Sequence, residues 1–112
     1  MKTLDRFASQ REVNIFAKLF EVNDAGRIAA YADHLLSAIA VKAPRQKDEL
    51  KRTLLVYFDA QHNMKRTADA MGLHINTVRQ RLRTLREITG GWGDPVKALE
   101  LHVALRLNAI LE

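Results

Sequence analysis

The chain of 112 residues is basic, with 18 lysines and arginines against 13 aspartates and glutamates, and 47% of its residues are hydrophobic. This length allows one small domain with a modest core, and the apolar fraction excludes a disordered basic tail. No cysteine is present, which excludes a disulfide framework and a thiolate metal site. No apolar run approaches the length of a membrane span, so we expect no membrane contact and a cytoplasmic location.

The first 43 residues have the apolar spacing of two amphipathic helices. The first helix has an apolar face made of Val13, Phe16, Ala17 and Phe20. Asn23 or Asp24 is suited to cap the second helix, whose apolar face comprises Ile28, Ala32, Leu35, Leu36 and Ile39. We assign residues 1–43 to an N-terminal helical extension, which either covers the core of the remaining chain or links it to further domains.

A basic connector, Lys42–Lys47, follows this extension, and Pro44 within it ends the second helix. A third helix is predicted to start near Asp48 and Glu49, because acids are favourable at the N-terminal end of a helix dipole. A catalytic carboxylate pair is the alternative interpretation, and the helix start is favoured. The inward stripe of this helix comprises Leu50, Leu54, Tyr57 and Phe58. We assign residues 44–112 to one domain.

The stretch Asn63–Arg86 has the pattern of two short helices joined by a tight turn. Asn63 is placed to cap the first helix, and Gly72 supplies the backbone freedom that a sharp turn needs. Ala68 is small where two helices must cross closely, and Leu73 follows the turn as an apolar residue. In the second helix the apolar face comprises Val78, Leu82 and Leu85. This spacing predicts a helix-turn-helix, in which the second helix enters a major groove.

The excess positive charge of the chain lies in this one stretch. It contains six basic residues and one acid, a net charge of +5, so the remaining twelve basic and twelve acidic residues cancel. A basic patch confined to one segment is typical of a nucleic-acid-binding surface. A solvated basic face on an ordinary helical bundle is the alternative, and the turn spacing favours the first interpretation.

Thr89, Gly90 and Gly91 end the second of these helices, either glycine being suited to the left-handed cap position. The glycines around Trp92 do not form a P-loop, because the Lys-Ser/Thr pair is missing and a helix rather than a strand precedes them. Trp92 is expected to anchor this loop on the core. Asp94 followed by Pro95 predicts the start of a final helix.

The final helix carries two apolar stripes on nearly opposite sides. One comprises Val96, Leu99, Val103, Leu107 and Ile110, and the other comprises Ala98, Leu101, Leu105 and Ala109. Two stripes imply burial from both sides. One side is expected to pack on the helix-turn-helix, and the other requires either the N-terminal helices or a second copy in a two-fold dimer.

The histidines do not form a recognisable metal or catalytic site. His34, His62, His74 and His102 show neither the HExxH pattern nor a ligand cluster on one helix, and no neighbouring spacing suggests a catalytic triad. We therefore expect no enzyme activity, no metal and no cofactor. His74 stands at the start of the second helix of the pair, where its side chain can cap the helix or reach a phosphate.

The chain from about Leu50 to Leu107 resembles the C-terminal DNA-binding domain of PucR/CdaR-type bacterial transcription regulators. The residues that carry the resemblance are Thr53, Leu54, Tyr57, Phe58, Asn63, Thr67, Ala68, His74, Asn76, Thr77, Arg81, Leu82, Thr89, Gly90, Asp94 and Pro95. The segment GLHINTVRQRL is also similar to the helix-turn-helix of the factor for inversion stimulation (Fis). Two positions depart from the family pattern, Ile75 where arginine is usual and Gln80 where tyrosine is frequent. The resemblance implies an all-α bundle of about six helices with a Fis-like helix-turn-helix.

The expected contacts with DNA divide into two groups. Base edges are read by His74, Asn76, Arg79 and Gln80. The DNA backbone is held by Lys65, Arg66, Thr67, Thr77, Arg83 and Arg86. Arg81 falls beside the apolar face, where it either pairs with an acid of the domain or touches DNA.

The resemblance implies double-stranded DNA as the partner, a role in transcription regulation, and sensory domains upstream of this segment. A homodimer is expected because paired half-sites multiply affinity. Two alternatives stay open, RNA binding and a protein-interaction module that uses the basic helix 75–88. The sequence lacks the exposed aromatic pairs that stack unpaired RNA bases.

Overall fold

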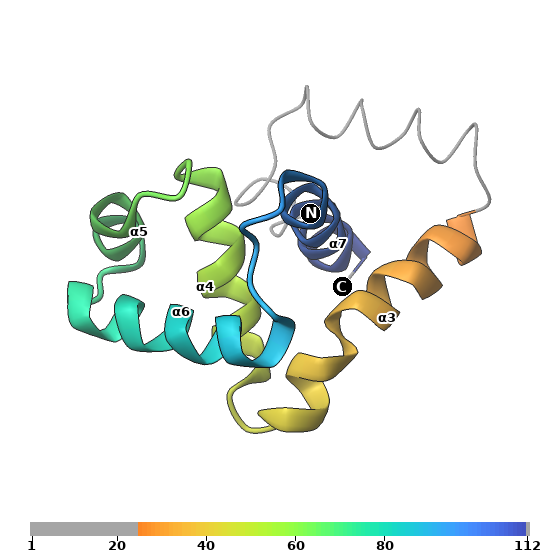
Figure 1. Cartoon of the computed structure of the whole chain (residues 1–112), viewed down its shortest axis with the longest axis horizontal. Coiled ribbons are helices and arrows are strands. Elements are labelled where there is room, and N and C mark those ends of the chain that lie inside the picture. Colours follow the sequence, from red (N-terminus) through yellow and green to blue (C-terminus); the bar gives the residue numbers. More distant parts are fainter. Residues whose placement is uncertain (1–24, 112) are drawn as a thin grey trace.

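The computed structural model describes residues 25–111, which form five helices and contain no strand (Figure 1). The helices are α3 Ala25–Lys42, α4 Lys47–Asp59, α5 Met64–Met71, α6 Ile75–Thr89 and α7 Pro95–Leu111. The all-α prediction is confirmed. The first predicted N-terminal helix, with its apolar face from Val13 to Phe20, falls outside the described residues, as do its neighbours Asn23 and Asp24.

One hydrophobic core runs through all of the long helices. Most of its members are residues that helical spacing placed inward, whereas Leu55 and Ala104 are buried outside the predicted stripes. The most deeply buried residues are Ile39 of α3, Leu54 of α4, Val78, Leu82 and Leu85 of α6, and Leu101 of α7. Because α3 contributes Ala32, Leu36 and Ile39 to this same core, the packing continues across the connector that precedes α4. Helix α3 therefore covers the core of the helix-turn-helix, one of the two roles expected for the N-terminal extension.

Helix α7 is buried by its own chain on the side of its second stripe. Leu101 and Leu105 are each 2% exposed, and α7 packs principally along α3 and also against α4. The second stripe thus needs no second copy to cover it. The first stripe is buried near the C-terminal end of α7, at Leu107, but exposed near the N-terminal end, where Val96 and Leu99 are 62% and 63% exposed. Within one chain, the first two turns of α7 therefore leave this stripe uncovered, and a second copy as its cover stays a prediction.

The helix ends follow the local signals in the sequence. The side chain of Asn63 accepts a hydrogen bond from the Arg66 amide (2.9 Å), and Asp94 Oδ1 accepts one from the Val96 amide (3.0 Å). Gly72 ends α5 at a φ of 66° and Gly90 ends α6 at a φ of 82°, both left-handed conformations that glycine adopts without steric cost.

A polar contact fastens α4 to α7. The Asp59 carboxylate at the end of α4 meets His102 Nε2 (2.9 Å) and accepts a hydrogen bond from Arg106 Nη2 (2.5 Å). Arg106 is buried, with 4% of its surface exposed, so this carboxylate compensates a charge inside the fold. Partial burial alone would raise the pKa of Asp59. The hydrogen bonds from His102 and Arg106 outweigh it and hold the pKa below its ordinary value.

Candidate nucleic-acid interface

Helices α5 and α6 form the predicted helix-turn-helix, and the turn between them is held by backbone hydrogen bonds. The Leu73 amide donates to the Ala68 carbonyl (2.9 Å), which closes the chain around the left-handed Gly72. Ala68 and Val78 are buried, so the two helices meet through small and branched side chains. Ile75 is partly buried and packs against the core, so it extends the apolar face of α6.

The residues predicted to read bases lie along the N-terminal half of α6. Asn76, Arg79 and Gln80 are exposed, and Arg79 Nη1 donates a hydrogen bond to Asn76 Oδ1 (2.5 Å). This contact holds the guanidinium of Arg79 beside the Asn76 amide, so the two side chains act as one polar group. They project from a helix whose opposite face is buried through Val78 and Leu82.

His74 is the cap of α6. Its Nδ1 accepts a hydrogen bond from the Asn76 amide (3.0 Å), and its backbone is extended. Because Nδ1 accepts here, the proton of the neutral ring resides on Nε2. The exposed side chain of His74 therefore has a donor left on its other edge while the ring caps the helix. Helix capping, one of the roles expected from the sequence, is present in the structure, whereas contact of His74 with a phosphate or a base edge stays a prediction.

The residues predicted to hold the DNA backbone occupy different environments. Lys65 and Arg66 are exposed in the first turn of α5, Arg83 is exposed on α6, and Thr77 is half-buried. Arg86 is exposed as well, and its guanidinium lies over the ring of Trp92, 4.7 Å from the centroid. This cation–π contact orients the Arg86 side chain along the end of α6.

Thr67 does not reach the surface, and its expected contact with DNA has to be corrected. Its side chain is fully buried, and its hydroxyl donates to the Asn63 carbonyl (2.8 Å). A hydroxyl inside the core cannot touch a phosphate, so Thr67 serves the packing of α5.

Arg81 is engaged within the fold. Its Nη1 donates to Thr53 Oγ1 (3.2 Å) and its Nη2 lies 3.6 Å from Glu49 Oε2. The Thr53 hydroxyl in turn donates to the Glu49 carbonyl (2.7 Å). The buried Thr53 side chain therefore links Arg81 to the backbone of Glu49. Of the two roles considered for Arg81, the internal pairing is present, and it ties α6 to the first turns of α4.

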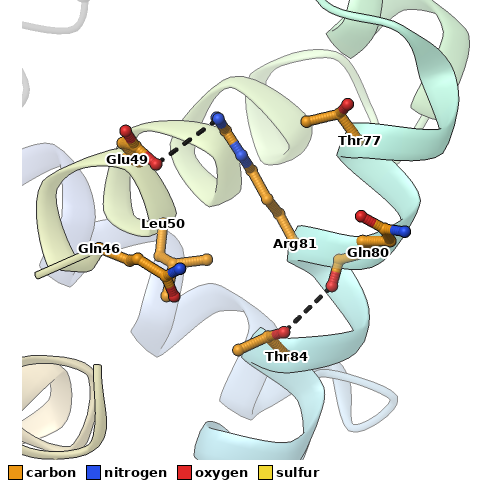
Figure 2. Close-up of a pocket in the computed structure, with 7 residues that line it drawn as sticks. All are labelled: Gln46, Glu49, Leu50, Thr77, Gln80, Arg81 and Thr84. Atoms are coloured by element: carbon orange, nitrogen blue, oxygen red, sulfur yellow. Dashed lines mark hydrogen bonds and ion pairs between the residues drawn. The ribbon is translucent and has the colours of Figure 1, made fainter.

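A pocket of about 280 Å³ opens beside this pair (Figure 2). It is lined by Gln46, Glu49, Leu50, Thr77, Gln80, Arg81 and Thr84. Thr77, Gln80 and Thr84 share one flank of α6 through their spacing of three, four and seven residues. The sequence contained this signal for α6 but none for Gln46, whose place beside α6 depends on how α4 packs.

Trp92 anchors the loop between α6 and α7, as the sequence predicted. Its ring is buried and meets Phe58 and Tyr57 edge to face, with both centroids at 5.9 Å. Within residues 25–111 no group of three or more histidine or acidic side chains is arranged to hold a metal ion. No helix among the same residues is both long and apolar enough to cross a membrane.

Comparison with known proteins identifies the fold unit. The family model of the PucR C-terminal helix-turn-helix domain matches residues 50–107, just over half of the chain. No curated protein and no solved structure matches the chain. The matched range begins in α4, contains the whole of α5 and α6, and ends within α7. The chain therefore belongs to the family of PucR C-terminal helix-turn-helix domains.

Proposed function

We propose that the chain binds double-stranded DNA in a sequence-dependent manner, as the DNA-binding module of a transcription regulator, with α6 in the major groove. The observation that carries this proposal is the exposed row of Asn76, Arg79, Gln80 and Arg83 on α6, a helix whose opposite face is fully buried. The diameter of an α-helix matches the width of the major groove of B-DNA. Membership of a helix-turn-helix family supports the same function.

The side chains divide the work by their chemistry. Arg79 is suited to a bidentate contact with guanine, and Gln80 is suited to adenine. Asn76 either binds adenine itself or aims the guanidinium that it already contacts. Lys65, Arg66 and Arg83 supply the phosphate contacts, with Arg86 and the half-buried Thr77 at the margins of the surface. These contacts fix position along the duplex and carry little sequence information.

The salt dependence of binding tests this proposal. Affinity for any duplex is expected to fall steeply with salt, each phosphate contact contributing about −0.9 to the log–log slope. Arg83→Ala is expected to lower affinity on every sequence and to flatten the slope by about one unit. Fluorescence anisotropy at several salt concentrations measures the affinity and the salt slope for duplex DNA, single-stranded DNA and RNA. A salt slope near zero for the wild type would reject DNA binding. Tighter binding to RNA than to duplex DNA would favour an RNA-binding function, and binding to no nucleic acid would favour a protein-interaction module.

We further propose that two copies occupy an inverted-repeat site, with recognition helices about 34–36 Å apart. The exposed Val96 and Leu99 are the apolar side chains of α7 that are available for the second copy. These two side chains of the described part of α7 offer a small apolar area, so we propose that they join the copies on DNA. Binding to adjacent half-sites raises the effective concentration and brings the copies together. Selecting bound sequences from a random duplex pool would reveal the half-sites and their spacing.

A further inference from the structure

The connector between α3 and α4 carries positive charge next to the recognition helix. Lys42, Arg45 and Lys47 supply three cations within six residues, no acid lies among them, and all three side chains are exposed. The segment links two helices, and the proposed function does not use its charges.

The structure places the connector on one flank of α6. Gln46, which stands between Arg45 and Lys47, lines the same pocket as Thr77, Gln80 and Thr84 of α6. In Figure 2 the Gln46 side chain lies across the pocket from Gln80, one of the residues proposed to read bases. The chain around Gln46 thus borders the surface of α6 that faces the groove.

Helix α5 and the connector lie on either side of α6 in Figure 1. When a helix lies in the major groove, a phosphate backbone runs along each of its sides. Lys65 and Arg66 at the start of α5 are placed for one backbone. The connector borders the other flank together with the first turn of α4, because Gln46 and Glu49 line a pocket with that flank.

We propose that the connector is a second DNA-backbone site, in which Arg45 and Lys47 bind phosphates on the side of the groove opposite to α5. This inference rests on the proposed function, since it assumes that α6 lies in the major groove. Glu49 at the rim does not cancel the two cations, because it is paired with Arg81 at 3.6 Å. Asp48 is exposed beside Lys47 and opposes the contact. That single acid provides a variant whose expected effect has the opposite sign.

Affinity measurements on the whole chain test the charges. The double variant Arg45→Gln, Lys47→Gln is expected to flatten the salt slope by about 1.8 and to lower affinity roughly tenfold near 0.15 M salt on all duplexes. Asp48→Asn is expected to raise affinity several-fold. Asp33→Asn removes the same charge from an exposed site on α3 and is expected to change nothing. Circular dichroism confirms that each variant is folded.

The two failures can be told apart. A wild type that binds no duplex would overturn both the proposed function and this site. A wild type that binds, with a double variant of equal affinity and equal salt slope, would overturn the connector site alone. Equal gains from Asp48→Asn and Asp33→Asn would do the same, because they would reflect net charge rather than position.

A position-specific readout is available because the chain has no cysteine. Arg45→Cys introduces a single thiol that can carry a DNA-cleaving iron chelate, and Asp33→Cys provides the matched control on α3. Cleavage from position 45 is expected along the backbone next to the bases protected by α6, and position 33 is expected to give none. Absence of cleavage from position 45 on a duplex that is bound would contradict the proposal.

Discussion

Arg79 illustrates how one side chain gains direction from its neighbour. Its guanidinium is held by Asn76 Oδ1 at 2.5 Å on an exposed helix face, so the fork of donors is oriented before any base is met. A pre-oriented guanidinium loses less side-chain entropy on binding, which favours specific contacts over diffuse attraction.

Substitutions in α6 are expected to distinguish the residues that read base edges from those that bind the DNA backbone. Arg79→Ala and Gln80→Ala should each cost about 1–3 kcal/mol on the preferred site and relax the base preference at one position. Arg79→Lys keeps the charge without the bidentate fork, so it should relax preference while leaving the salt slope unchanged. Selection from a random duplex pool measures the preference, and anisotropy at several salt concentrations measures the slope. An equal loss on every sequence would remove Arg79 and Gln80 from the base-reading set.

Asp59 is the residue whose protonation is expected to link folding to pH. Its pKa is lowered in the folded state, so folding favours the carboxylate. The stability gained is complete above the unfolded pKa of about 4 and is lost as the pH falls through the lower folded value. Asp59→Asn should therefore cost roughly 1–2 kcal/mol at neutral pH and nothing once the wild-type carboxyl is protonated. Urea unfolding at pH 7 and at steps down to a pH below the folded pKa of Asp59 tests this, with Asp33→Asn as control. A difference that persists at low pH would indicate a steric cause.

At the scale of the elements, the helix ends were predictable because their chemistry is local. Asn63 and Asp94 cap helices through their own side chains, and Gly72 and Gly90 take the left-handed conformation that their residue type permits. The turn between α4 and α5 was not predictable, because it uses Gln61 and His62 at φ values of 56° and 62°. Non-glycine residues seldom adopt this conformation. The His62 ring lies 5.1 Å from the rings of both Tyr57 and Phe58, and such contacts between helix and turn leave no trace in a local pattern.

In the candidate site, too, some features could be predicted from local sequence and others depend on tertiary packing. Exposure of Asn76, Arg79 and Gln80 followed from the helical wheel, because burial of Val78 and Leu82 determines the opposite face. The internal pairing of Arg81 depends on Glu49 and Thr53, which lie about thirty residues earlier in the chain. Periodicity placed Arg81 at the edge of the apolar face but contained no information about which helix packs against that edge.

Gly72 allows a test of the turn by itself. A Cβ added there would meet no atom within 4 Å, so the only cost of Gly72→Ala is the φ of 66°. We expect a loss of about 1 kcal/mol, since the left-handed conformation costs roughly 1–2 kcal/mol and the lower entropy of the unfolded chain returns part of it. Gly93→Ala is the control, because its Cβ also meets open space and its φ is not positive. Chemical denaturation measures both variants. Equal stabilities would show that the turn relaxes to another conformation.

At the scale of the whole molecule, α3 and α7 make the recognition unit part of a larger core. Helix α3 contributes Leu36 and Ile39, and α7 contributes Leu101 and Leu105, to the same core as the apolar face of α6. The position of α6 therefore depends on residues outside the helix-turn-helix itself. Core substitutions in α3 or α7 are expected to weaken DNA binding through loss of folding, which is a different effect from loss of contacts.

Substitutions in the two stripes of α7 are expected to have different effects, one on folding and the other on the association of two copies on DNA. Leu101→Asp with Leu105→Asp places two charges at positions that are 2% exposed, and we expect the domain to unfold because each burial costs several kcal/mol. Val96→Asp with Leu99→Asp changes positions that are more than 60% exposed, so stability should stay within about 0.5 kcal/mol per substitution. If these two side chains join two copies on DNA, the second variant should remain folded, bind a single half-site as the wild type does, and lose its advantage on an inverted repeat. Circular dichroism with sedimentation on duplexes that carry one or two half-sites measures each part. A Val96, Leu99 variant that still occupies both half-sites as tightly as the wild type would show that any dimer forms through another surface.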